Sequence, residues 1–270
     1  MQYVTAHGVT IPVLGLGTWD VHGKSAYRSV RAALEVGYRH IDTAQSYDNE
    51  REVGRAIADS GVERDELFVV TKVSPGNAAP ADVHRSTQRS LQQLGVGHVD
   101  LLLIHWPNRR VPVEATVEAL DEERDKGRTR LIGVSNYPSS LLRRALKVAP
   151  VATDQVEHHV LLGQDAVLRV LGQHDLPLTA YSPLARGAMF DMPQVVDIAA
   201  AHGKTPAQVA IRWLIQRPGR IAIPRSEDPG HIAANLDLFD FALSDDDMRR
   251  LDGLPKDHRV VNPPFAPAWD

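Results

Sequence analysis

The sequence predicts a (β/α)8 barrel, the TIM-barrel fold, with an N-terminal β-hairpin and an added C-terminal helix and tail. Eight short apolar runs alternate with amphipathic stretches from residue 13 onward, and this alternation is typical of a parallel sheet. Eight such units in a chain of 270 residues fit a closed barrel better than an open sheet. Because no Pro-, Gly- or Ser-rich linker divides the chain, residues 1–270 are expected to form a single domain.

The elements can be placed in order along the chain. A hairpin is expected over residues 2–13, with its turn at His7-Gly8. The barrel strands are expected at residues 13–17, 38–42, 67–72, 99–105, 131–134, 153–158, 178–181 and 221–223. The helices are expected at residues 25–35, 49–59, 81–94, 113–126, 139–148, 164–174, 193–202, 206–216 and around 231–236.

Start and stop signals support these bounds. Asn49 is placed to cap the second helix, and Gly61 and Gly127 follow helical patterns as C-terminal stops. Ser244 followed by acidic residues predicts the added helix over residues 244–251. The Pro-rich tail, residues 260–270, is expected to lie extended over the barrel, anchored by Phe265 and Trp269.

Composition excludes several classes of function. The chain is 43% hydrophobic and 24% charged, as in a soluble globular protein. Its net charge of −4 and the absence of a basic stripe argue against nucleic acid or a membrane surface as partner. It has no cysteine, no apolar run as long as a membrane span, and no signal-peptide pattern at its start. A cytoplasmic monomer acting on a small molecule is expected.

Four polar residues stand at or just past the C-terminal ends of three consecutive predicted strands: Asp42, Tyr47, Lys72 and His105. In a parallel barrel these strand ends meet on one face, where active sites are built. A carbonyl reduced by hydride becomes an alkoxide and needs a proton. A phenol serves as its donor if a nearby cation lowers the phenol pKa from about 10. Lys72 is the candidate cation, Asp42 its partner, and His105 the group that orients the carbonyl. Any one of these residues alone is more often structural, so the prediction depends on all four together.

Several motifs carry a resemblance to a known family. They are Gly15-Leu16-Gly17-Thr18-Trp19, Tyr38-Arg39-His40-Ile41-Asp42-Thr43-Ala44 with Tyr47 and Asn49-Glu50, Leu103-Ile104-His105-Trp106-Pro107, Ile132-Gly133-Val134-Ser135-Asn136-Tyr137 and Ala180-Tyr181-Ser182-Pro183-Leu184. In this order and spacing they resemble the aldo-keto reductases. The tail, from Val261-Asn262-Pro263-Pro264 to Ala268-Trp269-Asp270, is similar to that of short bacterial members, the 2,5-diketo-D-gluconate or methylglyoxal reductases.

The resemblance implies NAD(P)H-dependent reduction of aldehydes, α-oxoaldehydes and some ketones, with Tyr47 as general acid, Lys72 and Asp42 as its tuning pair, and no metal. It implies that the nicotinamide stacks on Tyr181 and that Ser135, Asn136 and Gln155 bind its carboxamide. The remaining implied cofactor contacts are Thr18, Ser182, Leu184, Arg186, Ile223, Arg225, Ser226, Glu227, His231 and Asn235.

The adenosine end departs from the family pattern. Where the family has Ile-Pro-Lys-Ser followed by Arg and Asn, this chain has Ile223-Pro224-Arg225-Ser226, then His231 and Asn235. Arginine keeps the cation, but a neutral imidazole contributes little to binding a phosphate dianion. Glu227 and Asp228 either face a ribose or cap the following helix. NADPH is therefore expected as cofactor, with NADH also accepted.

The substrate pocket is expected to have an aromatic wall of Trp19, Trp106 and Tyr47, with Met189, Phe190, Phe265 and Trp269 as further candidates. The short segment 108–112 predicts an open mouth for small substrates. Arg109 and Arg110 either steer anionic keto-sugars or are simply solvated. His158-His159 is not expected to be a metal site, because adjacent strand residues point to opposite faces, and the pair is either structural or solvent-facing.

Two other functions remain open at this stage. One is a nicotinamide-sensing interaction module of the same fold with little turnover, as the potassium-channel β subunits resemble this family. The other is a different barrel enzyme that forms a Schiff base on Lys72, which would require Lys72 to be unpaired.

Overall fold

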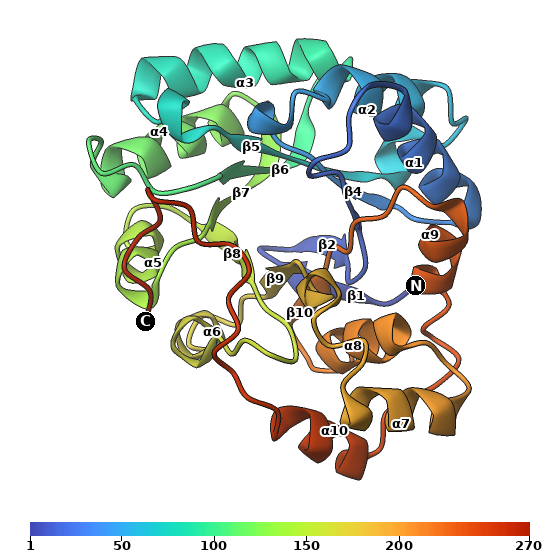
Figure 1. Ribbon diagram of the computed structural model, residues 1–270. Helices are drawn as coiled ribbons and strands as arrows, with labels where there is room; N and C mark the ends of the chain where they lie inside the picture. Colours follow the sequence, from blue (N-terminus) through green and yellow to red (C-terminus); the bar gives the residue numbers. More distant parts are fainter.

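In the computed structural model, which describes residues 1–270, eight parallel strands form a ring around the molecular axis (Figure 1). The strands are β3 (Leu16–Gly17), β4 (His40–Asp42), β5 (Phe68–Val73), β6 (Val99–Ile104), β7 (Thr129–Ser135), β8 (Val151–Glu157), β9 (Leu178–Tyr181) and β10 (Arg220–Ala222). They pair in sequence order from β3 to β10. Parallel bridges from Leu14 to Ala222 and from Gly17 to Arg225 join the two edges. The predicted (β/α)8 barrel is confirmed.

A two-stranded antiparallel hairpin, β1 (Tyr3–Ala6) and β2 (Val9–Pro12), precedes the barrel as expected. The helices form an outer layer around the strands (Figure 1). They are α1 (Gly23–Val36), α2 (Glu50–Ala58), α3 (Pro80–Leu94), α4 (Val113–Asp125), α5 (Ser139–Leu146), α6 (Asp165–Gly172), α7 (Pro193–His202), α8 (Pro206–Ile215), α9 (Pro229–Leu236) and α10 (Asp245–Asp252). None of them combines the length and apolarity needed to cross a membrane.

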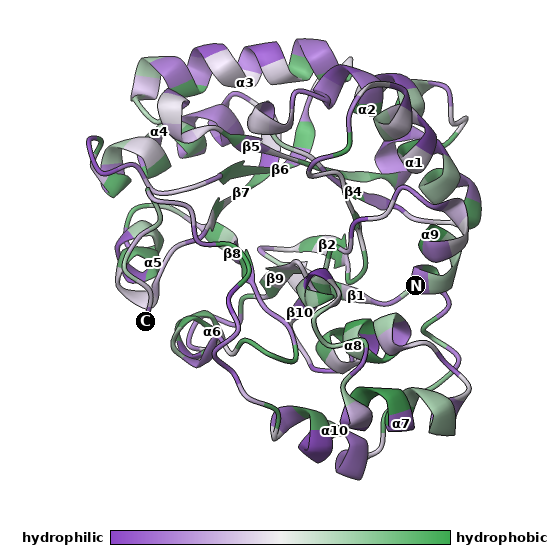
Figure 2. Ribbon diagram, in the orientation of Figure 1, coloured by the Kyte–Doolittle hydropathy of each residue, from purple (hydrophilic) through white to green (hydrophobic).

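The apolar core lies between the strands and the inner faces of the helices. It is one cluster of 66 buried residues, and the outward helix faces are largely hydrophilic (Figure 2). Closure of the ring depends on a glycine at position 17. A Cβ there would stand 2.8 Å from the Ile223 carbonyl oxygen, so only glycine lets the two edges approach this closely.

Most predicted bounds agree with the structure to within two residues, and Ser244 does cap α10 through its hydroxyl. Asn49 is the exception among the caps. It occupies the N-cap position of α2, but its side chain makes no capping bond. Its amide instead donates to the carbonyls of Thr18 and Val21, and its oxygen accepts from Thr43. Asn49 therefore ties the loops after β3 and β4 together.

The tail lies across the barrel mouth and ends beside α5 (Figure 1). The buried carboxylate of Glu157, at the end of β8, accepts the backbone amides of Val260 and Val261 at 2.7 and 2.8 Å. Phe265 packs edge-on against Trp106 with ring centroids 5.5 Å apart. Asp270 accepts hydrogen bonds from the Ser139 amide and hydroxyl at the start of α5. The expected extended tail is therefore held at its start, middle and end.

Candidate active site

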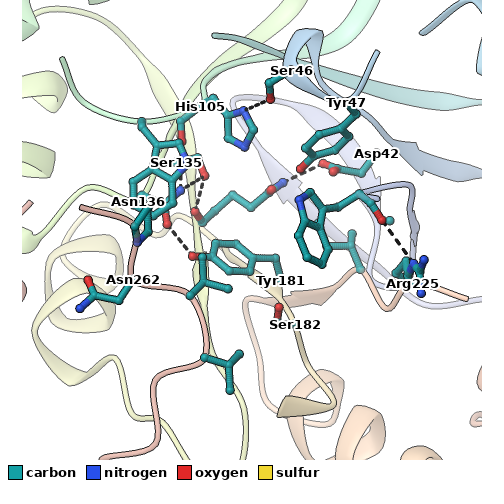
Figure 3. Close-up of a pocket in the computed structure, with 18 of the residues that line it drawn as sticks. Asp42, Ser46, Tyr47, His105, Ser135, Asn136, Tyr181, Ser182, Arg225 and Asn262 are labelled. Carbon is teal, nitrogen blue, oxygen red and sulfur yellow. Dashed lines mark hydrogen bonds between the residues drawn. The ribbon is translucent and has the colours of Figure 1, made fainter. Parts of the chain in front are cut away.

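The four predicted catalytic residues meet at one end of the barrel. Asp42 ends β4, Lys72 lies near the end of β5, and His105 directly follows β6. Tyr47 ends η1 (Gln45–Tyr47), a single 3-10 turn after β4. Asp42, Tyr47 and His105 line a cavity of about 520 Å3, and Figure 3 shows their side chains directed toward its centre. The parallel strands thus bring an acid, a phenol, an amine and an imidazole together.

The Lys72 ammonium is fully buried and is held by three oxygen atoms. Its Nζ lies 2.5 Å from Asp42 Oδ1 and donates to the Thr43 carbonyl at 2.9 Å and to the Tyr47 hydroxyl at 3.3 Å. The second Asp42 oxygen accepts from Gln155 Nε2 at 2.7 Å. The carboxylate is therefore bonded on both oxygens, and the buried cation is paired, as such a charge must be.

Burial and ion pairing act in opposite directions on this group. Burial lowers the pKa of Lys72, but the Asp42 carboxylate and the Tyr47 phenol outweigh it, and the pKa is raised overall. Burial raises the pKa of Tyr47, and the Lys72 cation only partly offsets this effect. The expectation that the Tyr47 pKa falls below its usual value is therefore wrong. The phenol is protonated at neutral pH, which a proton donor requires.

His105 is neutral because burial, reinforced by the Lys72 charge, lowers its pKa to about 3. Its Nδ1 lies 3.0 Å from the Ser46 hydroxyl oxygen. Its ring stands edge-on to Tyr47 with centroids 5.5 Å apart. At neutral pH, His105 is therefore an uncharged hydrogen-bonding group beside the phenol.

The opposite wall is formed by residues from β7, β8 and β9. Asn136 has a left-handed backbone, with φ of 63°, which asparagine tolerates better than most residues. Its side chain donates to the His105 carbonyl and the Ser135 hydroxyl, and accepts from the Tyr181 hydroxyl at 2.6 Å. These bonds fix the Tyr181 ring in the cavity (Figure 3). They also use most of the hydrogen-bonding capacity of the Asn136 amide within the protein. The Oε1 atom of Gln155, in contrast, has no hydrogen-bond partner.

A second cavity of about 990 Å3 continues from the first, and Trp19, Ser182, Arg186 and Arg225 line both. The Arg186 guanidinium stacks on the Trp19 ring, 4.8 Å from its centroid. Five further predicted contacts line the second cavity: Leu184, Ser226, Glu227, His231 and Asn235. Ile223 lines the first cavity instead. The result is a long groove with two cations at its middle.

The acidic residues beside Arg225 take different roles. Glu227 pairs with the Arg225 guanidinium at 2.6 Å. Asp228 caps α9 by accepting the His231 amide at 2.9 Å. Of the two alternatives left open by the sequence, capping is therefore correct for Asp228. Glu227 lies in the groove and partly neutralises the charge of Arg225.

Some expectations need correction. Thr18 lines neither cavity, because its buried hydroxyl donates to the Asp42 carbonyl. Met189 is fully buried in the core, and Phe190 lines only the second cavity. Trp106 lines the first cavity as predicted.

The His158-His159 pair is structural. Both rings are buried, which excludes the solvent-facing alternative. His158 bonds to the Leu162 carbonyl and His159 to the Glu157 carboxylate. No cluster of metal-ligating residues occurs in the chain.

Sequence reasoning missed much of the tail side of the cavity. Val260, Val261, Asn262 and Pro263 line it together with Phe265. Ser46, directly before Tyr47, also lines it. The sequence predicted that the tail covers the barrel. It did not predict which tail residues face the cavity, because that depends on hydrogen bonds to Glu157, which is distant in sequence. Ser46 carried the clearer signal, because it adjoins the proposed acid.

Comparison with known proteins identifies the family. The aldo/keto reductase family model matches residues 13–256. The chain belongs to the aldo/keto reductase family. It is 42% identical to an aldo-keto reductase of Mycobacterium avium, over 95% of this chain and 90% of the relative. It is 43% identical to an aldo-keto reductase of Mycolicibacterium smegmatis, over 94% of this chain and 93% of the relative.

Solved structures agree with this membership. A crystal structure of a provisionally assigned 2,5-diketo-D-gluconic acid reductase B has a TM-score of 0.98 and 40% identity, covering 100% of this chain and 98% of that one. The aldose reductase of Schistosoma japonicum has a TM-score of 0.91 and 31% identity, covering 97% and 94%. Membership in the aldo/keto reductase family supports NAD(P)H-dependent carbonyl reduction as the general activity.

Proposed function

We propose that this aldo/keto reductase reduces small aldehydes, α-oxoaldehydes and some ketones to alcohols, with Tyr47 as the general acid. One observation carries the proposal: the Tyr47 hydroxyl accepts a hydrogen bond from the buried Lys72 ammonium at the wall of the cavity. Because Lys72 is paired with Asp42 and stays protonated, a Schiff base on Lys72 is disfavoured.

Proton transfer follows from these contacts. Tyr47 is protonated before reaction because burial raises its pKa. Once it gives its proton to the alkoxide, the phenolate lies 3.3 Å from the Lys72 cation, whose charge stabilises it. Asp42 keeps that cation charged and in place. Neutral His105, on the same wall, orients the carbonyl by a hydrogen bond.

The groove fits a nicotinamide dinucleotide. Tyr181 offers a fixed ring at the first cavity, and Gln155 Oε1 is free to accept from a carboxamide. Arg186, which lines both cavities, places a cation where a diphosphate would lie, and Arg225, beside Ser226, offers a cation to the 2′-phosphate that distinguishes NADPH from NADH. Ser226, His231 and Asn235 would then surround the adenosine end. When bound, the reduced nicotinamide supplies the hydride that adds to the carbonyl carbon.

The mouth favours small substrates. Trp19 and Phe265 are 48% and 52% exposed at its rim, and only the short segment 108–112 stands between Pro107 and α4. Arg109 donates to the tail carbonyl of Ala266 and does not line the catalytic cavity. The catalytic cavity therefore has aromatic side chains at its mouth and no arginine from the 108–112 segment, which favours α-oxoaldehydes such as methylglyoxal over highly charged sugar acids.

The test of the reductase function is oxidation of NADPH with methylglyoxal. Tyr47→Phe keeps the ring and removes the acid, so turnover should fall by a factor of about 100 to 10,000, while NADPH binding, measured by calorimetry, is retained. Tyr3→Phe, at a residue 55% exposed and outside the groove, is the matched control. Cofactor binding without turnover across a panel of aldehydes and ketones would favour the sensing module instead.

Cofactor use is proposed to be NADPH with NADH also accepted, because Glu227 neutralises part of the Arg225 charge. The ratio of kcat/KM for NADPH over NADH should stay below about 1,000-fold, roughly 4 kcal/mol. Glu227→Gln frees Arg225 and should raise that ratio, whereas Glu63→Gln, an exposed acid without an ion pair, should not. A ratio already above this limit in the unmodified enzyme would show that Glu227 and His231 do not weaken phosphate recognition.

A further inference from the structure

Ser46 contacts His105 but has no part in the function described so far. Its hydroxyl oxygen lies 3.0 Å from His105 Nδ1, as the dashed line in Figure 3 marks. This is the only hydrogen bond that the Ser46 side chain makes, and the only one that the His105 ring makes. Both residues line the catalytic cavity.

The turn that carries Ser46 is fixed on both sides. Gln45, before it, accepts from the Ser74 amide and the Asn77 side chain and donates to the Ser90 hydroxyl. Tyr47, after it, accepts from Lys72. The Ser46 backbone is therefore placed beside His105 by the frame that positions the acid, and its exposed side chain reaches the ring from there.

The His105 backbone is fixed as well. Its amide donates to the Val73 carbonyl, and its own carbonyl accepts from Asn136. These bonds set where the ring lies, but they leave open which ring nitrogen carries the proton. A neutral imidazole has one donor nitrogen and one acceptor nitrogen. The single ring contact, with Ser46, therefore decides what Nε2 presents to the cavity.

The two arrangements have opposite consequences for a substrate. If Ser46 donates to Nδ1, Nε2 carries a proton and can bind a carbonyl oxygen. If Nδ1 donates to Ser46, Nε2 presents a lone pair that repels the same oxygen. Within the protein the Ser46 proton has no other acceptor, so donation to Nδ1 is the arrangement that pairs it.

We propose that Ser46 is a positioning residue, which holds the proton of His105 on Nε2 and so makes this ring a hydrogen-bond donor to the substrate carbonyl. This role rests on the proposed reductase function. It adds a determinant of carbonyl orientation from the residue next to the acid, so that the turn Gln45–Tyr47 supplies one contact to the reacting oxygen and sets the proton of the other, His105.

Three substitutions separate donation from simple packing. Ser46→Ala removes the donor and should lower kcat/KM for methylglyoxal by about 10-fold, the lower end of the effect known for groups that orient metal-binding histidines. Ser46→Thr keeps the hydroxyl and should stay within about threefold of the unmodified enzyme. Ser46→Asp supplies only acceptors and should cost at least about 100-fold, because the ring then turns a lone pair to the substrate.

The direct readout is the nitrogen-15 spectrum of labelled histidine. The chain has 12 histidines, so the His105 signals are assigned by their loss in His105→Gln. The proton should reside on Nε2 in the unmodified protein and in Ser46→Thr, and move to Nδ1 in Ser46→Asp. Ser140→Ala, at an exposed residue on α5, is the control for a serine lost elsewhere.

The outcomes distinguish this inference from the reductase function. A His105 proton on Nδ1 in the unmodified protein, or spectra unchanged in Ser46→Asp, overturns the role of Ser46 whatever the activity. Spectra that behave as expected in a protein without turnover on any carbonyl keep the role of Ser46 in setting the proton and overturn the reductase function. Circular dichroism of each variant verifies that the barrel is folded.

Discussion

Asp42 is the residue on which the charge of the site depends. Its side chain is 2% exposed and pairs with an ammonium that is wholly buried. A buried ion pair contributes little beyond what apolar residues would, but removing one partner leaves a charge without compensation. The value of Asp42 is therefore that Lys72 stays protonated beside Tyr47.

Asp42→Asn should destabilise the fold and slow turnover. The Lys72 charge loses its counterion, so the free energy of unfolding at pH 7 should fall by about 3–5 kcal/mol. The pKa of Lys72 should fall as well, because burial is no longer opposed by the carboxylate. Urea unfolding and the pH dependence of kcat measure the two effects.

A double variant separates charge from packing. Asp42→Asn combined with Lys72→Met removes both charges and should recover part of the lost stability but none of the activity. Equal stability losses in the single and double variants would show that the cost comes from packing around Asp42 and not from the stranded cation.

At this scale the sequence predicts which residues meet but not how their charges balance. Strand ends alone bring Asp42, Lys72 and His105 together, because parallel strands share one direction. The direction of the Tyr47 pKa shift could not be predicted, since burial by residues spread over the chain outweighs one nearby cation. The contact between Gln155 and Asp42 was missed for the same reason, because it joins residues 113 positions apart.

Among the elements, the crossing of α2 and α3 depends on Gly54. A Cβ added there would overlap the backbone carbonyl of Leu94, at the end of α3. Gly54→Ala should lower the free energy of unfolding by about 1–3 kcal/mol through overpacking, although alanine favours a helix by about 1 kcal/mol over glycine. Urea unfolding with an unchanged m-value checks this.

A matched glycine tests the cause. Gly172 ends α6 and has open space around the position of a Cβ. Gly172→Ala should therefore raise stability by about 0.5–1 kcal/mol. Equal behaviour of the two variants would mean that the α2–α3 contact does not constrain Gly54. Helical periodicity predicted α2 itself, but a close approach between two helices leaves no pattern in either one.

At the scale of the whole molecule, alternation and length were enough to predict the barrel, its hairpin and its added helix, because each follows from local patterns. The path of the tail was predicted only as a cover. Its register depends on the Glu157 carboxylate, 103 residues before Val260. The continuity of the two cavities likewise follows from the three-dimensional approach of Trp19 to Arg186, on the loops after β3 and β9.

Acid stability should reflect the buried histidines whose pKa is lowered by burial: His40, His105 and His158. Burial lowers the pKa of His105 and of His158 to about 3. In the unfolded chain each takes up a proton near pH 6.5, while the folded protein does not. Their contribution to stability is therefore complete above pH 6.5 and is lost progressively as the pH falls toward 3, at up to about 1.4 kcal/mol per proton and pH unit.

Buried carboxyl groups act in the opposite direction, since burial raises the pKa of Asp154 and Glu50, so a difference between variants is the decisive measurement. His158→Asn keeps an amide N–H that can bond to the Leu162 carbonyl, as His158 Nδ1 does, but cannot titrate. Urea unfolding at pH 7, 6 and 5 should show a stability gap between the unmodified protein and His158→Asn that narrows as the pH falls. A gap that stays constant would mean that His158 takes up its proton as readily in the folded protein as in the unfolded chain, contrary to its burial against Trp213.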